Sequence, residues 1–342
     1  MLDDLKYIHS RDAQDALGIA EKQWQQLQYK YQVSSIKYQN IENVVWAGMG
    51  GSAWPAMFVN SWPTLPIPLE IVRNYSLPPY VNKNTLLVAS SYSGNTEETL
   101  SALEDGESKG AQIVIITSGG KLAEIAQAKN YPLFLIPTGL QPRMSSFYFY
   151  AAAVQLFILA GLADVSKQQE LASAANWLSG ETATWRPDVP TTQNQAKKIA
   201  YELVGKSVVV YAGPLLAPAA NKWKISMNEN AKNLSWWNQY SEFSHNEFIG
   251  WSSHPIDKPF AVVEIRSNLE HPRVQKRFEI SEKLLSGKRP APQVVEPLGN
   301  TVPEQLIWSA NLGEFVSIYL AILNGVNPTP VDLIEKLKKE LG

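Results

Sequence analysis

The sequence predicts an α/β protein made of two three-layer α/β/α sandwich domains with mostly parallel sheets. Short runs rich in Val, Ile and Leu alternate with intervals of helix length in the first half of the chain, a pattern typical of a parallel sheet buried on both faces. The run at residues 44–48 is echoed at 209–213, again before a helix-forming stretch, which favours a duplicated unit. At 342 residues, the chain is long enough for two domains with a large core.

The expected elements follow in chain order. We expect strands at residues 44–47, 69–72, 86–90, 113–117 and 133–136, then at 209–212, 260–265 and 294–296. The apolar stretch at 147–163 approaches the length of a membrane span, but Gln155 interrupts it and Asp164 follows it, so we expect a helix buried between layers. The polar residues 166–196, which include Gly180, Pro187 and Pro190, are expected to connect an N-terminal domain at 1–165 to a C-terminal domain at 197–342.

Composition narrows the class of protein. The formal charge of −2 and the lack of a Lys/Arg cluster argue against nucleic acid as a partner, and the lysines at 336–339 fit the solvated face of a last helix. The chain has no cysteine and four histidines, so we expect neither disulfides nor a protein-bound metal. Because an acidic pair follows Leu2 where a signal peptide needs basic and then apolar residues, we expect a cytoplasmic protein that is not bound to a membrane.

Two serine-bearing turns follow expected strands. Residues 48–52 read Gly-Met-Gly-Gly-Ser, and residues 90–96 read Ser-Ser-Tyr-Ser-Gly-Asn-Thr. Glycine lets the backbone approach a ligand closely, and the first N–H groups of a helix favour an anion. Several hydroxyls around one anion indicate a phosphate. Either turn alone also fits an ordinary tight turn, but ligands of α/β folds bind at the carboxyl ends of strands, where we expect both turns.

The first turn also fits a dinucleotide fingerprint. Gly48, Gly50 and Ala53 have the required spacing, and Glu70 lies about where a ribose-binding acid would fall. Glu70 sits inside its expected strand rather than at the end, however, and this interpretation leaves the second serine turn unexplained. An NAD-dependent oxidoreductase is therefore a less favoured alternative.

Four motifs together resemble a known family. Residues 50–52 and 91–96 resemble the sugar isomerase (SIS) domain family, which binds phosphosugars. Residues 228–233 (Asn-Glu-Asn-Ala-Lys-Asn) and 244–251 (Ser-His-Asn-Glu-Phe-Ile-Gly-Trp) are similar to the bifunctional phosphoglucose/phosphomannose isomerases, a branch of the phosphoglucose isomerase superfamily. The resemblance runs from about residue 44 to the last helix. It implies two SIS-type domains that interconvert glucose 6-phosphate and mannose 6-phosphate with fructose 6-phosphate.

The resemblance also implies roles for individual residues. The positions that match the family's phosphate-binding residues are Gly51, Ser52, Ser91, Ser93 and Thr96. By the same likeness, Arg143 lies beside the reacting carbons, Glu229 is the base and His245 helps to open the sugar ring.

Two further positions match near the C-terminus. Thr329 and Lys336 resemble the family's threonine and lysine, and the threonine is linked to the acceptance of both epimers. The chain departs from the family pattern at 53–55, where Ala-Trp-Pro is bulkier than expected, and after Arg143. These departures concern substrate preference more than the reaction.

The expected chemistry suits these residue types. One carboxylate, Glu229, can move a proton between neighbouring carbons if its pKa rises from the usual value of about 4.3 toward working pH. The guanidinium of Arg143 can stabilise an enediolate, and a histidine that titrates near neutrality can assist ring opening. This reaction requires no metal or redox cofactor.

Each candidate residue also has a structural interpretation. Glu229 and Lys232 fit a solvated pair at a helix end, and Thr329 before Pro330 fits an N-cap. Arg143 fits a helix cap or a carboxylate partner, Lys336 fits a solvated position, and His254 rivals His245. If Glu229 is not the base, Glu247 and Glu242 are next. A phosphosugar-sensing SIS module without catalysis is the leading alternative function.

The resemblance finally implies an assembly. Isomerases of this superfamily are dimers whose histidine is donated across the interface, so we expect a homodimer in which His245 acts in the partner's site. The aromatic-rich residues 236–240 precede this histidine and are a candidate subunit contact.

Overall fold

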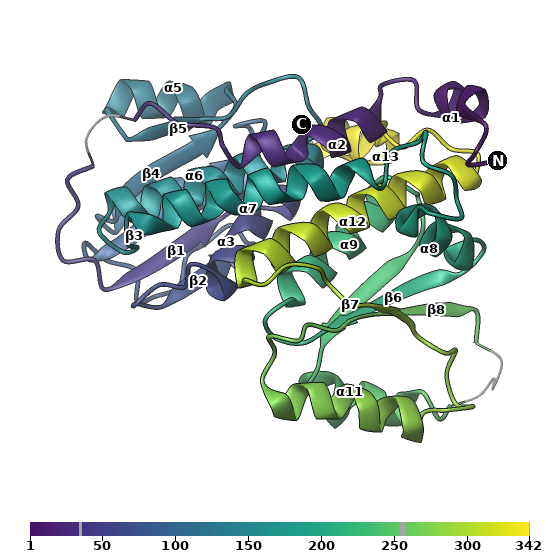
Figure 1. Cartoon of the computed structure of the whole chain (residues 1–342). Coiled ribbons are helices and arrows are strands. Elements are labelled where there is room, and N and C mark those ends of the chain that lie inside the picture. The colour runs from purple at the N-terminus through teal and green to yellow at the C-terminus, as the bar shows by residue number, and fades with distance from the viewer. Residues whose placement is uncertain (34–35, 254–257, 342) are drawn as a thin grey trace. The chain divides into compact units, whose positions relative to one another are not determined.

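The computed structural model describes residues 1–33, 36–253 and 258–341. It divides the chain into two compact units, one formed by residues 23–176 and the other by residues 1–22 together with 177–342. Each unit carries its own parallel sheet with helices packed on it (Figure 1). This arrangement confirms the predicted α/β class.

The sheet of the 23–176 unit has the strand order β2-β1-β3-β4-β5, and every pair is parallel. The strands are β1 (Asn43–Ala47), β2 (Leu69–Val72), β3 (Thr85–Ser91), β4 (Gln112–Thr117) and β5 (Leu133–Leu135). All five lie where the apolar runs predicted them. In this order the chain reverses direction across the sheet between β1 and β3, and α/β folds bind ligands at such a switch point.

Helices cover both faces of this sheet. They are α3 (Gly50–Ser61), α4 (Glu97–Ser108), α5 (Gly120–Lys129), the 3-10 helix η1 (Pro142–Ser145) and α6 (Ser146–Leu159). Val45 and Ala47 pack with Leu87 and residues of α4 and α5, whereas the intervening Trp46 donates its indole N–H to the carbonyl of Ser52 in α3. The two-residue alternation of the strands therefore builds a three-layer sandwich. The predicted buried helix at 147–163 corresponds to α6, in which ten of the fourteen residues are buried.

The second sheet has the order β7-β6-β8-β9, again all parallel. Its strands are β6 (Ser207–Ala212), β7 (Ser235–Gln239), β8 (Phe260–Ile265) and β9 (Gln293–Val295). The order matches β2-β1-β3-β4, so the echo of residues 44–48 at 209–213 places β1 and β6 at equivalent positions. The topology therefore confirms the predicted repeat.

The helices of the second unit include one that is buried almost throughout. The helices outside the first sandwich are α1 (Leu5–Arg11), α2 (Ala16–Gln26), α7 (Ser166–Ala183), α8 (Gln195–Leu203), α9 (Ala217–Glu229), η2 (Glu242–His245), α10 (Glu247–Gly250), α11 (Pro272–Leu284), α12 (Val302–Leu323) and α13 (Asp332–Leu341). Among the described helices, α12 alone is long and apolar enough to cross a bilayer, but 94% of its apolar window is buried. It packs on α9, where the indole of Trp223 donates to the carbonyl of Ser309.

The unit boundaries differ from the expected ones at both ends of the first sandwich. Residues 166–183 form the helix α7 rather than a connection, and the boundaries at 22/23 and 176/177 fall inside α2 and α7. The first 22 residues belong with the second unit, where the Asp3 carboxylate pairs with the buried Lys197 ammonium at 3.1 Å. Contacts between such distant residues leave no local sequence pattern.

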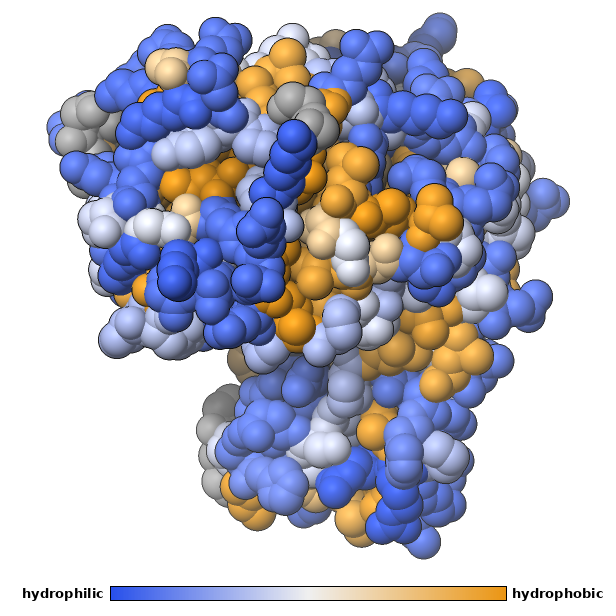
Figure 2. All heavy atoms as spheres, turned by 90° about the vertical axis from the view of Figure 1, so that its left-hand side faces the viewer, coloured by the Kyte–Doolittle hydropathy of each residue, from blue (hydrophilic) through white to orange (hydrophobic). Residues whose placement is uncertain are grey.

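The face of the molecule in Figure 2 is mostly hydrophilic, and hydrophobic residues form separate patches on it. Scattered apolar surface of this kind is ordinary for a folded protein.

Candidate active site

The two serine turns lie side by side at one edge of the first sheet. β1 and β3 are neighbouring parallel strands, so the turns that follow them share the carboxyl edge at the switch point. The main-chain N–H of Tyr92, in the second turn, donates to the Ser52 hydroxyl in the first at 3.1 Å. The Ser90 hydroxyl donates to the carbonyl of Ser52 at 2.9 Å. These bonds join the two turns into one cluster of hydroxyl groups, the cradle, which contains Ser52, Ser91, Ser93 and Thr96.

Inside the second turn the hydroxyls bond to one another. The Ser91 and Thr96 hydroxyls are 2.7 Å apart and the Ser91 and Ser93 hydroxyls 3.4 Å apart. Main-chain N–H groups of Gly94 and Asn95 donate to Ser91 and Ser93. Thr96 is the N-cap residue of α4 but makes no side-chain cap bond. Hydroxyls that can reorient in this way are suited to donate to a phosphate.

Glycines allow the two turns to approach. A Cβ on Gly48 would lie 2.8 Å from the carbonyl oxygen of Ser90, and one on Gly51 would lie 3.2 Å from the carbonyl oxygen of Pro142 and 3.3 Å from the Cα of Arg143. Gly51 is in the first turn of α3, whose N-cap Met49 offers no side-chain cap. The N-terminus of α3 therefore faces the cradle with main-chain donors and a favourable dipole.

Arg143 lies beside this cradle. Its main chain contacts the Gly51 position, and its side chain is 1% exposed in the 3-10 helix η1. Among the described residues of the 23–176 unit it is the one fully buried charged side chain. A buried guanidinium favours an anion nearby. The structure thus groups six predicted residues in one unit: Gly51, Ser52, Ser91, Ser93, Thr96 and Arg143.

Glu229 ends α9, at the amino edge of the second sheet. The side chain of Asn228 accepts a bond from the N–H of Ser235, the first residue of β7, at 3.0 Å. Glu229 is half-buried and is followed by the fully buried Asn230. The Glu229 carboxylate therefore lies near the start of β7, at the sheet edge opposite the carboxyl ends of the strands.

A buried ionic network fixes the end of α9. Lys222, 2% exposed, pairs with Glu314 of α12, 1% exposed. The Ser226 hydroxyl donates to Glu314 at 2.7 Å, and the Asn230 amide donates to Glu314 at 3.1 Å and to Ser317 at 2.9 Å. A buried pair is tolerated when further hydrogen bonds satisfy both charges, so this cluster anchors the turn that carries Glu229.

Lys232 connects this turn to Thr329. The Lys232 ammonium donates to the carbonyls of Asn327 and Pro328, at 2.7 and 3.1 Å. The next residue, Thr329, donates its N–H to the Asn327 side chain at 2.9 Å. Glu229 and Thr329 thus belong to two segments that one lysine ties together. Lys336, farther along on α13, is exposed.

His245 lies at the other edge of the second sheet. It closes the 3-10 helix η2, which follows the carboxyl end of β7, and it is exposed. The five residues of β7 span roughly 16 Å at about 3.3 Å per residue. Glu229 and His245 of one chain are therefore separated by the length of this strand, and the structure does not bring them together.

The rival residues are placed as follows. The Glu247 carboxylate accepts from the Tyr211 hydroxyl at 2.8 Å and from Asn238, and Glu242 accepts from Asn246. Glu70 is exposed in β2 and accepts from the Tyr80 hydroxyl at 2.6 Å. His254 lies outside the described residues. Across residues 1–33, 36–253 and 258–341, no group of three His, Asp or Glu side chains is arranged to hold a metal.

Sequence reasoning missed the ionic network and one buried carboxylate. Glu314 is a single acid within the apolar stretch of helix α12, and such an isolated charge is the signal that could have found the network. Glu270, 6% exposed, accepts from the N–H of Leu215 at 2.7 Å. Burial raises the pKa of Glu270, although the N–H groups of Leu215, Leu216 and His271 counteract the rise.

The chain is similar to phosphosugar isomerases over most of its length. Residues 192–341 match the family described as "Bacterial phospho-glucose isomerase C-terminal SIS domain". The chain is 35% identical over 327 residues to the bifunctional phosphoglucose/phosphomannose isomerase of Caldicellulosiruptor bescii, covering 93% of this chain and 96% of that one. It is 33% identical over 303 residues to the protein of the same name from Aquifex aeolicus, covering 88% and 90%. A solved glucose-6-phosphate isomerase like protein from Thermus thermophilus shares the fold, with a TM-score of 0.66 at 19% identity over 99% and 98% of the two chains.

Proposed function

The chain belongs to the family of bifunctional phosphoglucose/phosphomannose isomerases, and on this premise we propose that it interconverts glucose 6-phosphate and mannose 6-phosphate with fructose 6-phosphate. The single observation that best supports a phosphosugar substrate is the hydroxyl cradle, in which Tyr92 donates to Ser52 across the two turns. The cradle combines hydroxyls, a helix N-terminus and a neighbouring buried arginine. That set of donors is suited to a phosphate dianion.

In this proposal the cradle holds the 6-phosphate. Gly51 supplies a main-chain donor, and Ser52, Ser91, Ser93 and Thr96 supply hydroxyls. Each charge-assisted hydrogen bond to the ester is stronger than a neutral one. Fixing the phosphate orients carbons 1 and 2 of the sugar, which are the carbons that react.

Glu229 is the proposed base. Its carboxylate removes the proton from carbon 2 of an aldose phosphate and returns it to carbon 1. The hydroxyl proton passes from oxygen 2 to oxygen 1, so the carbonyl moves from carbon 1 to carbon 2. The enediolate between these two proton transfers carries its negative charge on oxygen, where Arg143 stabilises it. Thr329 and Lys336 are proposed to contact the sugar. Glucose 6-phosphate and mannose 6-phosphate differ only at carbon 2, so both give the same enediol.

His245 is proposed to act in the site of a second copy of the chain. Opening the hexose ring moves a proton between the ring oxygen and a hydroxyl, a task suited to histidine near neutral pH. The separation of Glu229 and His245 by the length of β7 supports a shared site, because one chain offers these groups at opposite edges of its sheet. β7 is also an edge strand that exposes Trp236. We propose a cytoplasmic homodimer.

An isomerase assay on both aldose phosphates tests the proposal. Wild type should convert glucose 6-phosphate and mannose 6-phosphate, with or without a chelator. Glu229→Gln should lose about 10²–10⁴-fold in kcat, the usual contribution of a general base, and should stop exchange of the carbon 2 proton with D₂O. Glu242→Gln is the matched control and should stay near wild type. Full activity in Glu229→Gln would overturn the assignment, and turnover of glucose 6-phosphate alone would remove the second substrate.

A further inference from the structure

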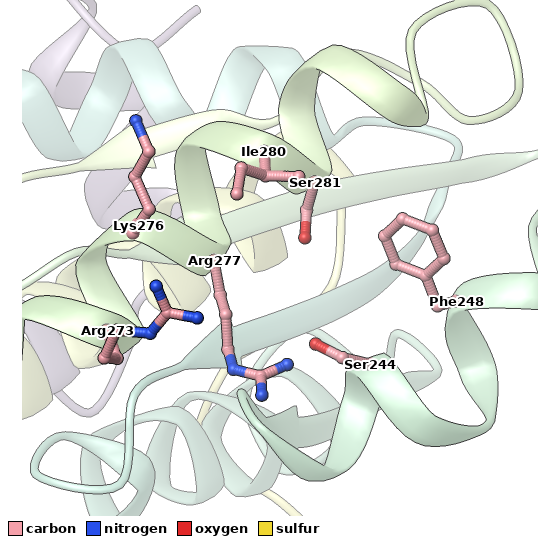
Figure 3. A pocket seen from close by; sticks show the side chains of 7 residues that line it. All are labelled: Ser244, Phe248, Arg273, Lys276, Arg277, Ile280 and Ser281. Carbon is pink, nitrogen blue, oxygen red and sulfur yellow. The ribbon is translucent and has the colours of Figure 1, made fainter.

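A basic cavity lies between helix α11 and the η2–α10 segment, which contains His245. It has a volume of about 250 Å³ and is lined by Ser244, Phe248, Arg273, Lys276, Arg277, Ile280 and Ser281. All of its charged lining residues are basic, in a chain whose net charge is −2. The cavity belongs to the second unit, between α11 and the η2–α10 segment (Figure 3).

The groups in the cavity differ in what they already contact. Lys276 pairs with Glu279 at 2.6 Å, and its ammonium points away from the Ser244 side of α11 (Figure 3). The guanidinium groups of Arg273 and Arg277 lie on the side facing Ser244. Within the described residues, neither guanidinium forms an ion pair with a carboxylate. Two cations thus face one space without an opposing acid.

Ser244 supplies the second observation that points to a ligand. Its hydroxyl oxygen is buried and has no hydrogen-bond partner in the part of the chain that the structure describes. A buried hydroxyl without a partner loses the hydrogen bonds it would make in water. An anion bound by the two arginines would satisfy this hydroxyl. On the opposite wall of the cavity, the Ser281 side chain forms a hydrogen bond with the Tyr240 hydroxyl. That hydroxyl donates to the buried Glu264 carboxylate at 2.8 Å.

We propose that this cavity binds a phosphate group, either inorganic phosphate or a small phosphate ester, and that binding holds the turn that presents His245. Guanidinium pairs bind phosphate through paired N–H donors. A volume of about 250 Å³ lies just below the range of drug-sized pockets, roughly 300–1,000 Å³, so the ligand is small. Because Ser244 directly precedes His245, the ligand ties α11 to that turn. The effect on catalysis rests on the proposed function, whereas the binding does not.

The test separates this cavity from the cradle, which also binds phosphate in our account. Ser91→Ala/Ser93→Ala removes cradle hydroxyls, and calorimetry then measures inorganic phosphate and glycerol 1-phosphate binding to the remaining site. We expect one equivalent to bind in this background. Adding Arg273→Gln/Arg277→Gln should weaken it at least about tenfold, since each charge-assisted contact is worth about that factor or more. Tighter binding of the ester would show that the cavity holds more than the phosphate alone.

Lys276→Gln is the matched control, because it removes one positive charge from the same helix but from a side chain that points away. It should leave the affinity within about twofold, as expected for an exposed, already paired charge. Equal weakening by Lys276→Gln and Arg277→Gln would show general electrostatics and overturn a specific site. Unchanged binding in Arg273→Gln/Arg277→Gln would overturn the proposal as well.

A second measurement uses the wild-type protein and needs no activity. Phosphate should slow amide hydrogen exchange in residues 242–250 of wild type but not of Arg273→Gln/Arg277→Gln. Crystals soaked in arsenate should show the anion between these arginines and Ser244, and arsenate found only at the cradle would contradict the proposal. If the isomerase assay fails while these results hold, the phosphate site stands and the proposed reaction falls.

Discussion

The two sheets have equivalent switch points, and the chain uses them in opposite ways. In the 23–176 unit, the turns after β1 and β3 bring hydroxyls and main-chain donors together. In the other unit, the turn after β8 carries Glu270, whose carboxylate accepts from Leu215 at the start of α9. A Cβ on Gly213 would lie 2.2 Å from this carboxylate. In the repeated unit, the main-chain donors that precede α9 therefore bind a carboxylate of the same unit.

The two units of this duplicated fold differ in which charged side chains they bury. The cradle unit fully buries one charged side chain among its described residues, Arg143. The other unit buries Glu264, Glu270 and Glu314, two of them paired with buried arginine or lysine. A buried guanidinium beside hydroxyls and main-chain donors suits a unit that binds an anion. A site whose charges are already balanced serves as a rigid support, here for Glu229.

The largest loss of stability should come from removing a carboxylate from the buried ionic network of the second unit. Glu314→Ala leaves Lys222 buried without its carboxylate, which we expect to cost about 3–5 kcal/mol in the free energy of unfolding. Ser91→Ala, in the hydroxyl network of the cradle, should cost only about 1 kcal/mol. Urea unfolding of both variants measures the difference. Similar losses in the two variants would contradict the proposed difference between the two networks. The double variant Lys222→Met/Glu314→Leu should recover most of the stability.

The next largest difference should come from alanine substitution of two glycines at equivalent positions, Gly48 after β1 and Gly213 after β6. A Cβ on Gly48 would meet the main-chain carbonyl of Ser90 at 2.8 Å, whereas on Gly213 it would meet the end of the Glu270 side chain. The backbone cannot move aside cheaply but a side chain can. Gly48→Ala should therefore cost about 1–3 kcal/mol and weaken hexose phosphate binding.

Gly213→Ala should cost less and leave the KM for hexose phosphates near wild type, because the change displaces a carboxylate outside the cradle. Thermal unfolding and KM, measured on both alanine variants, check the pair. A larger stability loss in Gly213→Ala than in Gly48→Ala would contradict the expectation that the Glu270 side chain can move aside.

The smallest effect concerns the pH dependence of stability. Burial raises the pKa of Glu270 above its unfolded value, with main-chain donors opposing the rise. A raised carboxyl pKa favours the folded protein below the unfolded value of about 4.3, and this contribution is lost as pH rises through the folded pKa. Glu270→Gln cannot ionise, so its stability relative to wild type should increase from about pH 4 upward. Urea unfolding across this range measures the trend, and a relative decrease would mean that the amides outweigh burial.

The fold was predictable where its signals are local. The apolar runs located eight of the nine strands, because buried parallel strands are nearly continuous in Val, Ile and Leu. β7 was not predicted, since its sequence Ser-Trp-Trp-Asn-Gln is that of a half-exposed edge strand. The placement of residues 1–22 with the second unit depends on long-range contacts such as that between Asp3 and Lys197.

The candidate site likewise has parts that the local sequence predicts and parts that only the fold reveals. The cradle was predictable because glycine, hydroxyls and a preceding strand lie within a few residues of one another. Glu314 and Lys222 are 92 residues apart, and Glu270 is 55 residues from Leu215, so their pairing required the fold. The opposite placement of Glu229 and His245 likewise emerged only once β7 was known to run between them.

Mixing two inactive chains tests whether the base and the histidine of one site come from different copies of the chain. Glu229→Gln and His245→Ala should each be inactive alone on cyclic hexose phosphates. After co-refolding at equal amounts, half of the dimers are mixed and each contains one intact site, so about a quarter of the wild-type activity should return. Absence of recovery in mixtures shown to contain heterodimers would contradict the account, because it would place both residues in a site formed by a single chain.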